Sequence, residues 1–159
     1  MTKYDIGLYD IGMIVPVIVV LHLHFAAPRE VTTAAFGPVA ESTWEPEFRP
    51  HFIAPEAPAQ VPGAVFTTGD GKVWLLHDYD PAAGLVQYVI VDPASQVVTL
   101  TIRVAAALAG SDVTMTYNVV PMGDAGSAHA ALLQQNATTL AAQMQGAVAS
   151  YLAAQPAKP

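Results

Sequence analysis

Two histidines, His22 and His24, could bind a metal because they lie two residues apart in an apolar run. Alternate residues of a β-strand point to the same face, so a strand over residues 17–25 would place both imidazoles side by side. A metal site needs at least a third ligand, and Glu41 and His51 are distant candidates. Nothing local completes the set, so we expect hydrogen-bonded imidazoles on the solvent side of the strand, with no bound metal or other cofactor.

A second set of residues with possible acid–base chemistry lies in the run 73–79. His77 and Asp78 are consecutive, and consecutive side chains of a strand face opposite ways, so they cannot act as a pair. Tyr79 would share a face with His77 and makes the better pair. Arg103, which the alternation of its own strand places outward, would hold a carboxylate-bearing ligand only if it pointed inward.

Catalytic motifs with a recognisable sequence pattern are absent from the chain. No glycine-rich phosphate loop precedes a helix, and no Gly-x-Ser-x-Gly turn occurs. The catalytic residues of any enzyme activity are therefore unassigned, and we favour a role without catalysis.

Apolar side chains with a few tyrosine hydroxyls are the remaining candidates for a binding site. In the run 112–120, Met115 and Tyr117 share one face, and a helix over 127–154 would carry an apolar stripe at helical spacing. In the run 73–79 both faces contain apolar residues, so which face points inward stays open. The tyrosines could orient an apolar molecule. The residues that we expect to contact a ligand are Trp74, Leu76, Tyr88, Met115, Tyr117, Leu140, Met144 and Tyr151.

Turn signals divide the chain into the elements that must position these side chains. Turns with Gly or Pro separate apolar runs at even spacing, which predicts an antiparallel meander. A long helix is expected over 127–154, with Ser127 as its N-cap, and two short helices are expected after Pro28, separated at Gly37-Pro38. Residues 44–62 contain five prolines and are expected to be irregular, as a lid or portal would be. The expected strands cover residues 17–25, 64–68, 73–79, 85–91, 97–108 and 112–120.

The clearest family pattern lies in three stretches of the chain: LHLHFAAPREVTTAAF, VWLLHDYDPAAGLVQYVIVDP and SDVTMTYNVVPMGDAG. Together they resemble the START-like superfamily, which includes the SRPBCC and Bet v 1-like proteins, over roughly residues 17–153. The resemblance implies an α+β helix-grip fold: a curved seven-stranded antiparallel sheet wraps around a long C-terminal helix, and two short helices follow the first strand. It also implies a hydrophobic cavity, since members bind lipids, hormones or polyketides. Some members are cyclases or hydroxylases.

The composition limits the partners that the chain can have. The formal net charge is −7 with only six Lys and Arg in 159 residues, so nucleic acid is a poor partner. The apolar run 11–25 is too short and too interrupted to span a bilayer, so stable membrane insertion is not expected. Hydrophobic residues make up 53% of the chain, which requires a large core or an apolar binding surface. The lack of cysteine fits a cytoplasmic protein.

These observations predict one START-like domain at residues 13–154, preceded by an N-terminal arm at 1–12 and followed by a polar tail at 155–159. The expected function is binding of a hydrophobic small molecule or lipid in a cavity between the sheet and the C-terminal helix. One alternative is a protein-interaction module that forms a homo-oligomer. The other is an enzyme of the cyclase or hydratase type that uses the same cavity.

Overall fold

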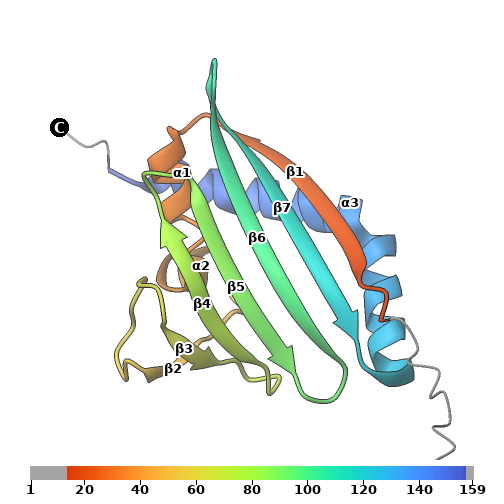
Figure 1. Cartoon of the computed structure of the whole chain (residues 1–159). Coiled ribbons are helices and arrows are strands. Elements are labelled where there is room, and N and C mark those ends of the chain that lie inside the picture. Colours follow the sequence, from red (N-terminus) through yellow and green to blue (C-terminus); the bar gives the residue numbers. More distant parts are fainter. Residues whose placement is uncertain (1–13, 157–159) are drawn as a thin grey trace, which may run out of the picture.

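Seven antiparallel strands form one sheet in the order β1-β7-β6-β5-β4-β3-β2 (Figure 1). The protein is seen in a computed structural model that describes residues 14–156, so the predicted arm at 1–12 and the end of the predicted tail lie outside the described residues. The first strand pairs with the last, which leaves β1 and β2 at the two edges. The strands are β1 Val17–Phe25, β2 His51–Ala54, β3 Val65–Thr67, β4 Val73–Asp80, β5 Leu85–Asp92, β6 Gln96–Ala107 and β7 Gly110–Pro121.

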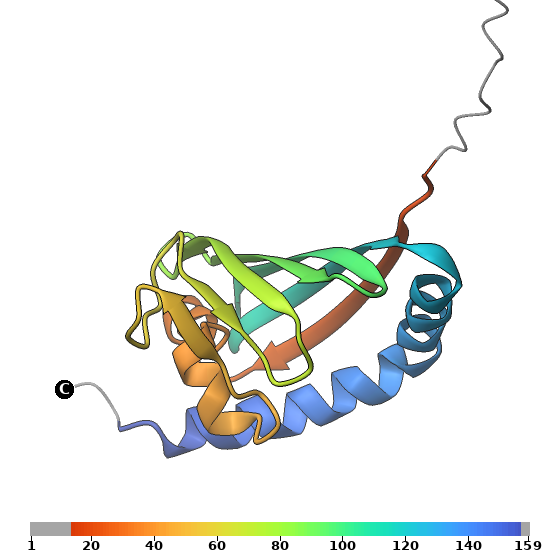
Figure 2. The same ribbon diagram turned by 90° about the horizontal axis from the view of Figure 1, so that it is seen from below.

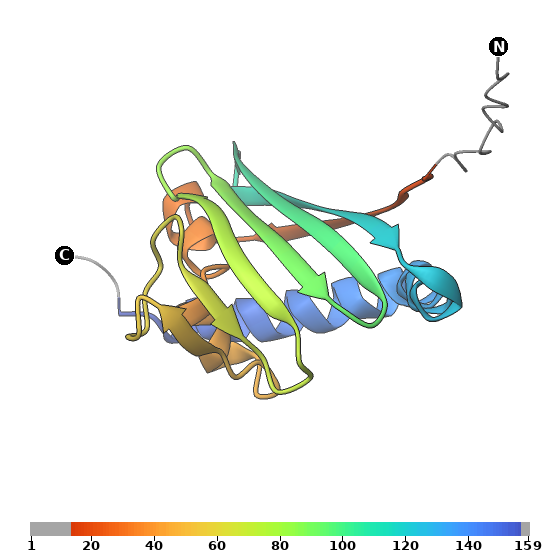
Figure 3. The ribbon, with the colours of Figure 1, turned by 60° about the horizontal axis from the view of Figure 1, so that its bottom comes forward.

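Three helices accompany the sheet: α1 (Arg29–Ala34), α2 (Pro38–Trp44) and α3 (Gly123–Ala154). The sheet curves over α3, which packs mainly against β1 and β7 and also touches α2 (Figures 2 and 3). This is the helix-grip arrangement that the sequence predicts, with two short helices after the first strand. None of the helices in residues 14–156 is long and apolar enough to cross a membrane.

The alternation of the long strands turns one face of the sheet toward α3 and confirms the predicted inward faces of β6 and β7. Arg103, between two of the inward positions of β6, is exposed on the outer face, as the alternation predicts. The predicted stripe of α3 packs against the same core, with Val148 fully buried. The inward residues of the two strands are Val98, Leu100, Ile102, Val104, Val113, Met115, Tyr117 and Val119.

The start of α3 differs from the prediction. The sequence predicts a helix that begins with Ser127 as its N-cap, but Met122 occupies the cap position and Ser127 donates a hydrogen bond to the carbonyl oxygen of Gly123 at 3.2 Å. The glycines of this segment suggested a turn. Gly126 instead serves a close approach, because a Cβ atom there would lie 1.9 Å from the carbonyl oxygen of Ser95.

A β-bulge in β4 contradicts the predicted pairing of His77 with Tyr79. The register against β5 shifts between Leu76 and Asp78, so the strict alternation of side chains is interrupted there. His77 is exposed at the bulge, whereas Tyr79 packs against the core together with Leu76. The imidazole and the phenol therefore do not form an acid–base pair.

The proline-rich residues 44–62 contain the edge strand β2, which pairs with β3. Phe48 and Phe52 anchor the segment in the core, whereas Ile53 is 49% exposed. Consecutive residues of a strand face opposite sides, so Phe52 and Ile53 cannot both point inward. A lid role for the segment stays a prediction.

Candidate functional site

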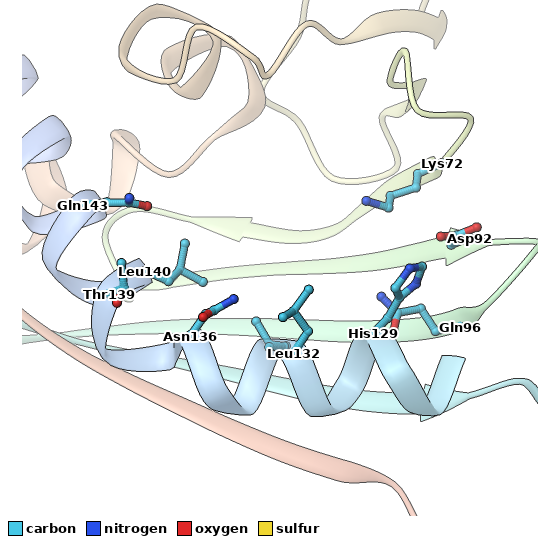
Figure 4. Close-up of a pocket in the computed structure, with 10 residues that line it drawn as sticks. Lys72, Asp92, Gln96, His129, Leu132, Asn136, Thr139, Leu140 and Gln143 are labelled. Carbon is cyan, nitrogen blue, oxygen red and sulfur yellow. The ribbon is translucent and has the colours of Figure 1, made fainter. Parts of the chain in front are cut away.

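A pocket of about 570 Å³ opens between α3 and the ends of three strands (Figure 4). Lys72 precedes β4, Asp92 ends β5 and Gln96 begins β6, so the turns of the meander bring these three polar residues to one place. The opposite wall comes from α3, where residues three or four apart share a helix face. The α3 residues of the pocket are His129, Leu132, Leu133, Asn136, Thr139, Leu140 and Gln143.

The pocket is amphipathic. Three leucines of α3 provide an apolar wall, and the strand ends provide charged and amide groups, as Figure 4 shows for Lys72 and Asp92 opposite Leu132. Pockets with a mainly apolar lining and a few polar groups are typical of small-molecule sites. The arrangement can bind a molecule that has an apolar body and a polar end.

The charges beside the pocket are partly paired with one another. The Nζ atom of Lys72 lies 2.6 Å from a carboxylate oxygen of Asp70. The hydroxyl of Ser95 donates to Asp92 at 2.7 Å and holds the pKa of the Asp92 carboxyl below its usual value, so this group is ionised at neutral pH. This end of the pocket therefore has two carboxylates, those of Asp70 and Asp92, and one ammonium group, that of Lys72.

Gln96 carries a polar atom with no partner. Its Oε1 atom is buried and is the only buried side-chain polar atom of residues 14–156 that makes no hydrogen bond. Buried acceptors are nearly always paired in proteins, because an unpaired one loses its hydrogen bonds to water without replacement. Since Gln96 lines the pocket, a bound molecule is an available source of the missing donor.

The eight residues predicted to contact a ligand all belong to the core between the sheet and α3 or pack against it. Leu76, Tyr88 and Met115 are buried, and the other five keep part of their surface accessible. Leu140 is the one residue of the predicted set that lines the pocket of about 570 Å³. The predicted set thus lies on the inner face, and its contact with a ligand stays a prediction.

Aromatic packing fills the part of the inner face nearest β3. Trp74 stacks on Phe66 with ring centroids 5.7 Å apart and meets Tyr88 edge-on at 5.6 Å. Phe48 lies edge-on to Trp74 at 5.3 Å. The Tyr88 hydroxyl donates to the carbonyl oxygen of Phe36 at 2.8 Å, so that hydroxyl is already engaged. These rings support the fold.

Glu41 is an inner carboxyl group whose setting the sequence analysis did not recognise. Burial, and to a lesser degree the charge of Glu45, raises its pKa to about 8, so it is protonated at neutral pH. Burial raises the pKa of Tyr117 and of Tyr88 above the usual tyrosine value, and the charge of Glu41 adds to both shifts. Glu41 therefore lies close to two residues of the predicted site.

The spacing of α2 could have revealed this position. Trp44 is buried and donates to the carbonyl oxygen of Ala35 at 2.7 Å, which fixes the inward face of α2. Glu41 lies three residues earlier and so shares that face. Within residues 14–156, the Glu41 carboxyl group makes no hydrogen bond with another side chain or with the backbone.

The histidine pair lies on the outer face of β1, as predicted. His24 bonds to a carboxylate oxygen of Asp112 at 2.7 Å, and His22 lies 3.5 Å from the Thr114 hydroxyl. His51 is in β2 at the opposite edge of the sheet, and Glu41 is on the inner side, so neither candidate third ligand reaches the pair. No group of three or more metal-ligating side chains occurs in residues 14–156.

Comparison with known proteins supports the fold. No protein-family model and no curated protein matches the chain, but solved structures resemble it. An uncharacterised protein from Rhizobium leguminosarum is 16% identical, with a TM-score of 0.62 over 89% of this chain and 97% of its own. Norcoclaurine synthase from Thalictrum flavum, in complex with dopamine and hydroxybenzaldehyde, is 13% identical, with a TM-score of 0.66 over 91% and 90% of the two chains.

A third solved structure, that of Ara h 8.0201, is 14% identical with a TM-score of 0.63, over 87% of this chain and 98% of its own. All three matches extend over nearly the whole of both chains. At these identities the likeness shows a shared fold, and it carries no residue-level assignment of function.

Proposed function

We propose that this chain, which has the START-like (SRPBCC, Bet v 1-like) helix-grip fold, binds a hydrophobic small molecule or lipid between its sheet and α3. The observation that carries the proposal is the pocket of about 570 Å³ beside α3, with its wall of Leu132, Leu133 and Leu140. A ligand would enter past these leucines and extend along the inner face toward Tyr117 and Met144.

Incomplete burial of the inner face supports this route. Tyr117, Met144 and Tyr151 pack against the core and still keep part of their surface accessible. Apolar and aromatic side chains that line internal space gain free energy when an apolar molecule removes their remaining contact with water. Glu41, neutral at neutral pH, would add a polar group to this wall at a lower desolvation cost than that of a charge.

The binding route can be blocked from α3. Ala137 packs against the core within the helix stretch that lines the pocket, so Ala137→Trp should fill the space. Titration with a neutral dye that fluoresces in apolar surroundings should show saturable binding to the parent protein and at least a tenfold loss of affinity in the variant, equal to about 1.4 kcal/mol.

The matched control is Ala142→Trp, which places the same side chain on an exposed position of α3. This control should bind the dye as the parent does. Equal dye affinity in the parent and in a folded Ala137→Trp variant would show that the binding site lies elsewhere.

A homo-oligomer is the second candidate, because one edge of the sheet exposes aliphatic side chains. Ile18 and Val20 on the outer face of β1 are 50% and 44% exposed, and β1 is an edge strand. If this edge forms an interface, light scattering after size-exclusion chromatography should give a dimer mass for the parent and a monomer mass for the double variant Ile18→Lys, Val20→Lys. A monomer mass for the parent across the accessible concentrations would exclude a stable interface.

A further inference from the structure

We propose that the strand-end side of the α3 pocket selects molecules whose polar end donates hydrogen bonds, a hydroxyl or an amine, over molecules that end in a carboxylate. This inference rests on the proposed function, since it specifies the polar end of the hydrophobic molecule that would enter beside α3. The inference follows from an unpaired acceptor and from the balance of charge around it.

The unpaired acceptor is Oε1 of Gln96, which is buried and makes no hydrogen bond within residues 14–156. Gln96 lines the pocket, and the terminal torsion of a glutamine side chain has a broad energy profile, so the amide can turn toward a bound molecule. A hydroxyl or amine would supply the donor that the amide oxygen lacks, whereas an ionised carboxylate has only acceptors. Pairing a buried acceptor recovers the free energy that its burial costs.

The balance of charge points the same way. Lys72 is the one Lys or Arg that lines the pocket, and its ammonium group already lies 2.6 Å from Asp70. Asp92 adds a second carboxylate at the same end. A carboxylate ligand would therefore meet more negative than positive charge, and it would also leave its own hydration shell on entry.

The other polar groups of the pocket do not reverse this preference. The His129 ring offers both a donor and an acceptor nitrogen in its neutral form, and the amide of Asn136 offers both as well. These side chains can adapt to either kind of ligand. Gln96 and the charges of Lys72, Asp70 and Asp92 therefore discriminate between donor-ended and carboxylate-ended ligands.

The leucines of α3 determine that the remainder of the ligand must be apolar. Leu132 and Leu140 lie across the pocket from the polar strand ends (Figure 4), and Leu133 lines the same pocket. A molecule that satisfies both walls has an apolar chain or ring system with one donor group at its end. Decanol, decylamine and decanoate are simple probes of this class, because they share one chain length and differ only in the terminal group.

The test is competition of these three probes against the bound neutral dye, at neutral pH and with the full chain. We expect decanol and decylamine to bind about tenfold or more tightly than decanoate, the factor that about 1.4 kcal/mol produces. Gln96→Met should reduce the advantage of decanol over decanoate, because methionine keeps the length of the side chain without the amide. Gln135→Met, the same substitution at an exposed position of α3 that does not line the pocket, should leave the ranking unchanged.

Two outcomes would overturn the inference while the proposed function stands: decanoate binding as tightly as decanol, or a folded Gln96→Met variant that keeps the full advantage of decanol. The ranking in the unmodified chain needs no variant, so it decides the matter even if Gln96→Met fails to fold. If neither the dye nor any of the probes binds, the proposed function itself is contradicted, and the inference falls with it.

Discussion

Glu41 is a half-buried glutamate whose surroundings change its protonation state. An ordinary glutamate would be ionised at neutral pH, but burial near Tyr88 and Tyr117 keeps this one protonated until the pH reaches about 8. A neutral carboxyl group costs far less to bury than a carboxylate. The interior can therefore accommodate this polar residue among apolar side chains. As a consequence, the free energy of unfolding depends on pH.

The sign of that dependence follows from the raised pKa. Between the ordinary glutamate pKa of 4.5 and the raised pKa of about 8, Glu41 binds more protons in the folded than in the unfolded chain, so stability falls as the pH rises through this window. Glu41→Gln removes the titration and keeps the size of the side chain. The variant should match the parent in mild acid and exceed its unfolding free energy by roughly 1–3 kcal/mol at alkaline pH.

Urea denaturation across the pH range measures this difference, with Glu30→Gln as the control because Glu30 is exposed on α1. The control should follow the parent at every pH. If Glu41→Gln and the parent lose stability in parallel between mild acid and alkaline pH, the Glu41 carboxyl is ionised in the fold, and its assigned environment is wrong.

At the scale of the elements, α3 shows what the sequence could and could not predict. Its apolar stripe follows from helical spacing and is found as expected, with Val148 buried and Met144 against the core. The glycines at 123 and 126 resemble a turn signal, so the sequence pattern predicts a start of the helix later than Gly123. A glycine is needed at position 126 because the helix backbone there approaches Ser95, about thirty residues away in the chain. A local sequence pattern cannot predict a contact between residues so far apart.

Two glycines of α3 provide a matched pair of substitutions. A Cβ atom at Gly126 would lie 1.9 Å from the Ser95 carbonyl oxygen, whereas at Gly146 no atom lies within 4 Å. Gly126→Ala should therefore destabilise the fold by about 1–3 kcal/mol through overpacking. Gly146→Ala should stabilise it by about 0.5–1 kcal/mol through helix propensity.

Urea midpoints of the two variants give the comparison directly. The opposite signs matter more than the magnitudes, since both substitutions make the same chemical change in the same helix. Equal stabilisation by the two alanines would mean that α3 does not approach Ser95 in the turn between β5 and β6, and that the helix begins later, as the sequence pattern predicts.

The strands, too, were predicted in part. Period-two alternation correctly predicted the inward faces of β6 and β7, where both strands run without interruption. It failed in β4, because the bulge at His77 shifts the register and moves Tyr79 to the core side. A bulge depends on the pairing with β5 rather than on the residues of β4 alone, so the residue pattern of β4 does not predict it.

At the scale of the whole molecule, the family resemblance predicted the sheet, the order of the elements and the long helix. It did not predict where the open space lies. α3 packs against β1 and β7 (Figure 2), and the pocket lies between α3 and the residues at the start of β4, the end of β5 and the start of β6. The predicted ligand residues therefore lie deeper than the pocket, with Leu140 common to both.

Methyl NMR with decanol as the probe tests the central claim most directly, because it reports where a bound molecule lies. We predict saturable shifts at Met115, Leu140 and Met144 on the inner side, with little change at Leu108 or Met122, which are exposed. Shifts confined to the exposed methyl groups, or no shift at saturating decanol, would contradict binding between the sheet and α3.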